Sequence, residues 1–251
     1  MFAAIAMTVS FLFIMLYEAK IGNNVDTSMI FKLLTSGVFV AAGIIGVILN
    51  KQNSMYKWFI LSGLIVALIG DFCLAYQYKS GDIWFMIGMG AFVVTHVLFT
   101  LGLYQIDGFR WREVIISAVF YGLLAWFLLT RGNGMGYMTV PVLIYMATMA
   151  FMCGKAFSAV ISRGAIIGEM GFFLILAGVL LFTVSDIILG ICMFVDIGEL
   201  VRSLTANKLA FCGKADDIMV FNAFTYFIGQ TLIACSIYYV GRTQGGGSDV
   251  F

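Results

Sequence analysis

The residues of this chain that are able to do chemistry are a few ionisable and polar side chains within long apolar stretches. The ionisable ones are Lys32, Asp71, His96 and Asp186, and the neutral polar ones are Tyr145, Ser185, Tyr226 and Gln230. A charged group at the centre of a bilayer costs about 2.5–3.5 kcal/mol on insertion scales, so an ionisable residue within a membrane span is a functional candidate. Two buried carboxyl groups can divide acid and base roles, because burial favours the neutral form of one while an ion pair or hydrogen bonds keep the other ionised.

Each candidate also has a purely structural interpretation. Asp186 could join two helices by a hydrogen bond, and Asp71 stands near the end of its apolar run. Lys32 could extend its ammonium to the membrane surface, and His96, the only histidine, could be a hydrogen-bonded core residue. The neutral polar candidates could be packing residues. Two aspartates at compatible depths favour the functional interpretation.

The composition places these residues in a membrane protein. Of the 251 residues, 62% are hydrophobic and 11% are charged, whereas a soluble domain carries about 45–50% apolar and about 25% charged residues. A soluble globular protein is therefore excluded. Fourteen Lys and Arg against thirteen Asp and Glu give a formal net charge of +1, which excludes a basic surface for nucleic acid.

The apolar residues fall into eight runs, each near the length of about 20 residues that a helix needs to cross the hydrocarbon core. The runs cover residues 2–17, 29–49, 57–76, 83–104, 113–130, 137–157, 170–195 and 218–240. Barrel strands would be shorter and would alternate in hydrophobicity. We therefore expect an all-α, polytopic integral membrane protein with eight transmembrane helices in one bundle. Residues 1–241 would form a single transmembrane domain and residues 242–251 a flexible tail.

The charges between the runs suggest an orientation. With eight spans, both termini share a side, and the loops there carry the basic pairs Lys51/Lys57, Arg110/Arg112 and Lys155/Arg163. This bias favours cytoplasmic termini, although the seventh loop at 196–217 opposes it with three basic residues. Counted along the helices, all the candidate residues lie within about 20 Å of the face that bears the odd-numbered loops. We therefore expect them to line one cavity open to that side.

Several mechanisms are excluded by the sequence. One histidine cannot supply a three-histidine zinc site, and no HExxH motif is present, so we expect no metal. The chain has no GxSxG motif for a serine nucleophile and no GxxxxGK[ST] loop for ATP. We expect no cofactor.

Five segments of the chain resemble the YhhN-type lysoplasmalogenases, a family of eight-helix membrane proteins. The segments are Phe31-Lys32-Leu33-Leu34, Ile69-Gly70-Asp71, Gly90-Ala91-Phe92 with Thr95-His96, the stretch from Gly178 to Ser185-Asp186, and Tyr226-Phe227-Ile228-Gly229-Gln230. The resemblance covers nearly the whole chain. It implies hydrolysis of the vinyl ether bond of lysoplasmalogens, which releases a fatty aldehyde and glycerophosphocholine or glycerophosphoethanolamine.

The residues permit this chemistry. Protonation of the outer alkene carbon of a vinyl ether gives an oxocarbenium ion, which water captures as a hemiacetal. We hypothesise that Asp186 is the general acid and that Asp71 is the base or the anion that stabilises the cation. Lys32 would pair with Asp71 or bind the substrate phosphate, and His96 would orient water or shuttle protons. The substrate-binding residues would be Lys32, Tyr145, Ser185, Tyr226 and Gln230.

Two other functions stay open. Gly70-Asp71 is similar to part of the GxGD motif of aspartyl intramembrane proteases, but the second aspartate follows this segment and the only proline, Pro141, is not in a PAL motif. A proton-coupled transporter would use the same buried Asp, Lys and His, but the chain shows no internal repeat. The expected partners are a lysophospholipid substrate and the bilayer, and a homo-oligomer is left open. The location would be the inner membrane of a bacterium or the endoplasmic reticulum of a eukaryote.

Overall fold

The structure is a computed structural model that describes most of the chain. The described residues are 1–20, 25–52, 54–80, 82–132, 135–167, 169–196 and 215–240. The predicted flexible tail at 242–251 and the basic residues of the loop before the last span lie outside the described residues.

Eight helices in the described part of the chain are long and apolar enough to cross a membrane, which confirms the predicted all-α membrane bundle. The helices are α1 (Phe2–Lys20), α2 (Val25–Leu49), α3 (Met55–Ser80), α4 (Asp82–Asp107), α5 (Trp111–Arg131), α6 (Thr139–Ile167), α7 (Glu169–Phe194) and α9 (Ala215–Tyr239). A single 3₁₀ turn, η1 (Gly136–Met138), precedes α6.

Several helices continue beyond the apolar runs that predict them. The prediction ends the sixth span at residue 157, but α6 continues to Ile167. The added turns carry Ser158 and Ser162, and the Ser162 hydroxyl donates a 3.1 Å hydrogen bond to the Ser158 carbonyl. A helix satisfies its own backbone groups in the headgroup region as well as in the hydrocarbon. Hydropathy therefore locates the buried middle of each helix better than its ends.

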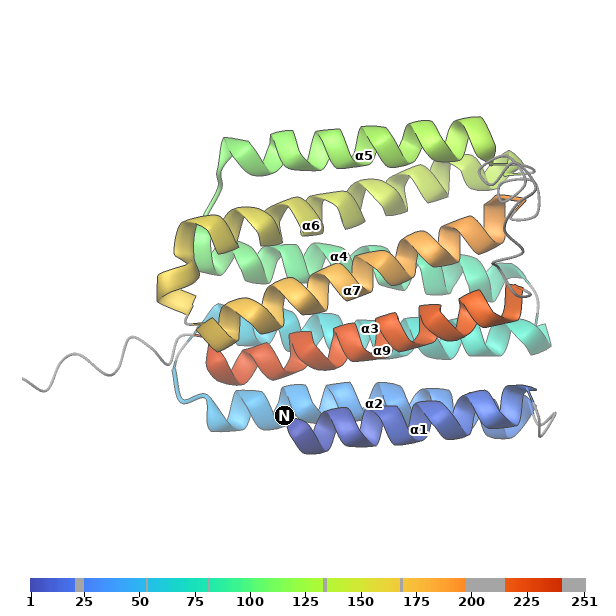
Figure 1. The fold of residues 1–251 in the computed structure, drawn as a ribbon, viewed down its shortest axis with the longest axis horizontal. Coiled ribbons are helices and arrows are strands. Elements are labelled where there is room, and N and C mark those ends of the chain that lie inside the picture. Colours follow the sequence, from blue (N-terminus) through green and yellow to red (C-terminus); the bar gives the residue numbers. More distant parts are fainter. Residues whose placement is uncertain are drawn as a thin grey trace, which may run out of the picture.

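Helices that follow one another in the sequence mostly pack side by side, and α9 returns to the interior of the bundle (Figure 1). It packs against α7 and α2 and also contacts α1 and α3. The helix α5 lies at one edge, mainly against α6, and α1 and α2 lie at the other. The residues of α9 are therefore well placed to meet side chains from several helices.

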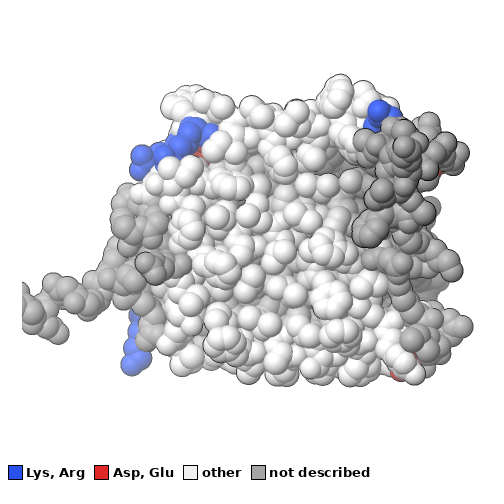
Figure 2. Space-filling model, in the orientation of Figure 1, with Lys and Arg blue, Asp and Glu red and all other residues white. Residues whose placement is uncertain are grey.

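The described surface shows the division expected of a membrane protein (Figure 2). On the face drawn there, the wide middle band carries no charged side chain among the described residues, and the blue basic groups lie at the two ends. Exposed aromatic residues such as Trp111 and Tyr137 lie near helix ends, where amphipathic rings meet the headgroups. The apolar band is the surface that lipid covers.

Two glycines allow α7 and α9 to approach closely. A Cβ atom on Gly178 would lie 2.9 Å from the Gly229 carbonyl oxygen, and a Cβ atom on Gly229 would lie 2.9 Å from the Gly178 carbonyl oxygen. Small residues at such a crossing let two backbones pack in a membrane. This crossing sets the position of Asp186, two turns beyond Gly178, relative to Tyr226, one turn before Gly229.

The sequence interpretation assigned Lys57 and Lys155 to the loops between the spans, and the structure shows that this assignment is wrong. Lys57 lies in the first turn of α3, where its buried ammonium donates to the carbonyls of Asn50 and Gln52 at 2.8 and 2.7 Å. Lys155 lies within α6 and is fully buried. Both lysines therefore serve helix packing and do not carry the exposed loop charge that the orientation argument needs.

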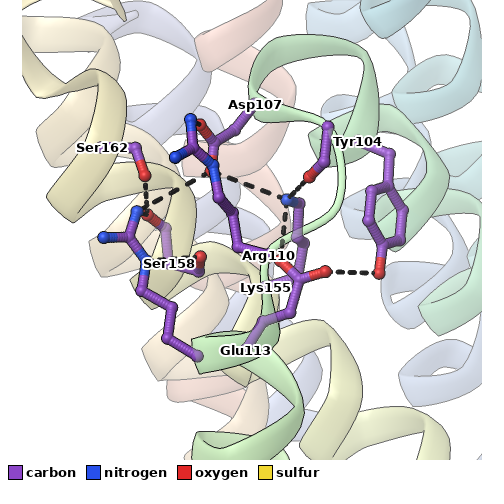
Figure 3. A network of polar contacts seen from close by, with 9 residues as sticks. Tyr104, Asp107, Arg110, Glu113, Lys155, Ser158 and Ser162 are labelled. Atoms are coloured by element: carbon purple, nitrogen blue, oxygen red, sulfur yellow. Dashed lines mark hydrogen bonds and ion pairs between the residues drawn. The ribbon is translucent and has the colours of Figure 1, made fainter.

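A buried ionic network joins α4, α5 and α6 at one end of the bundle (Figure 3). The Lys155 ammonium lies 2.8 Å from Glu113 Oε2 and 3.8 Å from Asp107 Oδ2, and it also donates to the Gly108 carbonyl. Tyr104 donates a 2.7 Å hydrogen bond to Glu113 Oε1. The side chains of Lys155, Glu113 and Asp107 are completely buried. Asp107 also pairs with Arg110 and Arg112 at 3.3 and 3.9 Å, whereas Lys155 and Glu113 compensate each other.

We expect the Lys155→Met substitution to destabilise the bundle by about 3–5 kcal/mol, because it leaves the Glu113 carboxylate buried without its cation. Lys51→Met is the matched control, since Lys51 is exposed. Unfolding by titration with a denaturing detergent measures both variants. Equal stability of the two variants would contradict a structural role for this network.

Candidate active site

The Asp71 carboxylate lies where α2, α3 and α9 meet. Its Oδ2 atom accepts hydrogen bonds of 2.7 Å from the hydroxyls of Ser36 and Tyr226, and its Oδ1 atom lies 3.9 Å from Lys32 Nζ. Lys32 and Ser36 are four residues apart, which places them on the same face of α2. The Asp71 side chain is 2% exposed, whereas that of Lys32 is 27% exposed. Two hydrogen-bond donors and a cation favour the ionised form of this carboxyl group, whereas its burial favours the neutral form.

The second carboxylate, that of Asp186, is paired with the only histidine. His96 Nε2 on α4 lies 3.0 Å from Asp186 Oδ2 on α7, and both side chains are buried. His96 Nδ1 lies 3.3 Å from Thr148 Oγ1 on α6, and the Thr148 hydroxyl donates a 2.8 Å hydrogen bond to the Tyr145 carbonyl. The imidazole is therefore held between two helices, with a carboxyl group on one nitrogen and a hydroxyl on the other.

These contacts limit where the protons of the pair can lie. The 3.0 Å contact between Nε2 and Asp186 Oδ2 needs a proton, which is on the carboxyl group or on Nε2. The one hydroxyl proton of Thr148 can go to the Tyr145 carbonyl at 2.8 Å or to His96 Nδ1 at 3.3 Å. The shorter contact favours the carbonyl, and Nδ1–H then donates to Thr148. In that arrangement the pair holds a proton that it can donate.

Two tyrosines lie beside the two carboxyl groups. Tyr226 donates a 2.7 Å hydrogen bond to Asp71, and the Tyr145 ring centroid lies 5.0 Å from that of His96. The Phe182 ring contacts both halves, with its centroid 5.1 Å from that of His96 and 5.7 Å from that of Tyr226. Aromatic contacts therefore join the two aspartates into one site in the interior of the bundle.

An apolar cavity adjoins the Asp186 side of this site. It is lined by residues of α3, α4, α5, α6 and α7 and encloses about 720 Å³, including its mouth. Among the described residues that line it, Tyr145 and Asp186 are the polar ones, and the others are aliphatic, aromatic, methionine or glycine. The cavity follows α7 from Asp186 to Phe194. Its composition suits a hydrocarbon chain whose polar end stops at Asp186.

The expectation that all the candidate residues line one cavity is only partly met. Asp186 and Tyr145 lie on the cavity wall, and Lys32 and Asp71 do not line it. Asp71 instead contacts the Tyr226 hydroxyl, and the Tyr226 ring centroid lies 5.7 Å from that of Phe182. The site therefore has a polar side, where Lys32, Ser36 and Tyr226 meet Asp71, and an apolar side, where the cavity adjoins Asp186.

Gln230 and Ser185 differ from the other predicted residues in their contacts. The Gln230 side chain is completely buried, and neither atom of its amide has a hydrogen-bond partner among the described residues. Ser185 is buried and is joined to α9, because Asn222 Nδ2 donates to its carbonyl at 2.6 Å and to its hydroxyl at 3.1 Å. Among the described residues, neither side chain hydrogen-bonds to Asp71 or Asp186, so the substrate-binding roles of Gln230 and Ser185 stay predictions.

The sequence interpretation missed three polar residues that complete these contacts: Ser36, Thr148 and Asn222. Hydroxyl and amide side chains are common between membrane helices, so composition does not single them out. Helical spacing was the one available signal. Ser36 follows Lys32 by one turn and Thr148 follows Tyr145 by three residues, so each lies on the same helix face as a candidate residue.

A comparison with known protein families matches residues 27–237 to the YhhN family. The chain belongs to the YhhN family. The match confirms the resemblance predicted from the sequence and includes every candidate residue from Lys32 to Gln230. Membership of the YhhN family, known as lysoplasmalogenase-like, implies hydrolase activity. Comparisons with curated proteins and with solved structures find no match.

The proton count on His96 can be tested directly, since the chain has one histidine and a protein labelled with ¹⁵N-histidine gives signals from that residue alone. We expect Nδ1 to be protonated, in either the neutral or the cationic ring, because Thr148 offers it an acceptor. Solid-state or detergent NMR of the ring nitrogens measures this. A neutral ring with the proton only on Nε2 would contradict the arrangement.

Proposed function

We propose that this protein is a lysoplasmalogenase that hydrolyses the vinyl ether bond of lysoplasmalogens. The observation that carries the proposal is the position of Asp186. This residue lies 3.0 Å from His96 Nε2 and, among the described residues, is one of the two polar groups on the wall of an apolar cavity. A single-chain lipid presents the matching arrangement, a long hydrocarbon chain joined to a polar head through the reactive bond.

The first step is transfer of a proton from the Asp186–His96 pair to the outer alkene carbon. The alkene electron pair forms the new C–H bond, and the positive charge is shared between the inner carbon and the ether oxygen. The Asp71 carboxyl group, which Lys32, Ser36 and Tyr226 contact, would supply the negative charge when it is ionised. Such preorganised charge stabilises the cation without reorganisation during the reaction.

In the second step, water adds to the inner carbon and loses one proton to Asp71, which gives the hemiacetal. The hemiacetal then collapses: its hydroxyl proton passes to the Asp186–His96 pair, the C–O bond to glycerol breaks, and the glycerol oxygen takes the proton held by Asp71, which restores both groups. The products are a fatty aldehyde and a glycerophospho head, and one water is consumed. The Tyr226 hydroxyl, 2.7 Å from Asp71 Oδ2, orients that carboxylate for the base role.

The proposal also places the two ends of the substrate. Lys32 is the more exposed partner of the Asp71–Lys32 ion pair, so its ammonium is available to the phosphate of the substrate's head group. The hydrocarbon chain lies in the cavity along α7. The bilayer delivers such a lipid, so the reaction needs no soluble carrier. The proposed partners are thus a lysophospholipid and the surrounding membrane.

We expect Asp186→Asn and Asp71→Asn, each introduced alone, to lower aldehyde release by about 100-fold or more, the factor usual for loss of a general acid or base. The substrate is an alkenyl-glycerophosphocholine presented to the purified protein in detergent. Glu18→Gln is the matched control, because Glu18 is a carboxylate near the end of α1 and has no part in the site. Full activity of either aspartate variant would rule out the two-carboxylate mechanism.

A further inference from the structure

The wall of the apolar cavity has a gap at Gly190. This glycine lies on α7, lines the cavity, and follows Asp186 by four residues, which places both on the same face of the helix. A Cβ atom added to Gly190 would meet no atom within 4 Å. Gly178 on the same helix is different, because a Cβ atom there would collide with α9.

Packing does not explain a glycine at position 190. The residue lies in the interior of a regular helix, where glycine is less favourable than alanine or leucine. A larger side chain would project into the open cavity one turn from the Asp186 carboxyl. The space next to Gly190 is therefore the part of the cavity that joins the reactive group to the rest of the apolar wall.

We propose that Gly190 is a specificity-determining position, whose missing side chain leaves room beside Asp186 for the hydrocarbon chain of the substrate. This inference rests on the proposed function and adds the position on α7 that the chain lies against. From Asp186 to Phe194 the cavity wall follows α7 for about 12 Å, and Gly190 stands midway along this stretch.

The space beside Gly190 can be tested with a saturated ether lysolipid, 1-O-hexadecyl-glycerophosphocholine. This lipid has no alkene carbon to protonate, so it reports binding alone. The full chain is placed in nanodiscs of diacyl phosphatidylcholine, so that two-chain lipid is present in excess throughout. Binding of the radiolabelled lysolipid is then measured for wild type, Gly190→Leu and Gly190→Ala. Gly122→Leu is the matched control, since Gly122 is exposed on α5 and also has open space around it.

We expect Gly190→Leu to weaken binding by about tenfold or more, the factor for about two CH₂ groups that lose their burial, while Gly122→Leu binds like wild type. Gly190→Ala adds one carbon to open space and should weaken binding by about threefold. If the Gly190→Leu variant does not fold, the affinity of the Gly190→Ala variant for the lysolipid tests the proposal.

Unchanged affinity in both Gly190 variants, equal losses in Gly190→Leu and Gly122→Leu, or no specific binding by wild type would overturn the proposal. Failure of the proposed function has a different signature. In that case wild type releases no aldehyde from the alkenyl lipid, whatever its affinity for the saturated one.

Discussion

A charge inside a bilayer has to be compensated within the protein, because hydrocarbon offers it neither water nor counterions. This requirement explains where the helices of this chain meet. Asp71 lies where α2, α3 and α9 converge, and Asp186 lies where α7 meets α4 next to α6. The close crossing of α7 and α9 at Gly178 and Gly229 brings these two places together. The backbone packing and the charge compensation therefore depend on each other.

The two buried ionic groups in the described part of the bundle differ in what lies beside them. In the network around Lys155, the ammonium contacts two carboxylates and a carbonyl, and Asp107 also pairs with the exposed side chains of Arg110 and Arg112. In the other group, Asp186 lies on the wall of an apolar cavity, and Asp71 pairs with the partly exposed Lys32. Charges that pair with one another stabilise helix packing. A carboxyl group on a cavity wall is placed to act on a ligand.

The sequence predicted the eight helices because the length and apolarity of each run follow directly from the thickness of the hydrocarbon core. It also predicted the ionisable residues of the site, since such residues are rare within spans. One of its two alternatives for Lys32, an ion pair with Asp71, is the arrangement that the structure shows. The pairing of His96 with Asp186 was not predicted, because hydropathy does not determine how a nearly uniformly apolar helix is rotated about its axis.

Other features had no signal in the sequence. The burial of Lys155 and Glu113 depends on the contact of α6 with α5, so the two residues looked like ordinary charges near helix ends. Ser36 and Thr148 are neutral residues whose importance comes only from the charged groups beside them. The Phe182 ring contacts both His96 and Tyr226, but in the sequence it is one of 24 phenylalanines.

The central claim is that Asp186 protonates carbon and that water then attacks the inner carbon of the vinyl ether. Hydrolysis in water labelled with deuterium and heavy oxygen, followed by mass spectrometry of both products, tests this claim most directly. The account predicts an aldehyde with one deuterium on the carbon next to the carbonyl, and glycerophosphocholine without heavy oxygen. Heavy oxygen in the glycerophosphocholine would show cleavage of the bond to glycerol and would contradict the account.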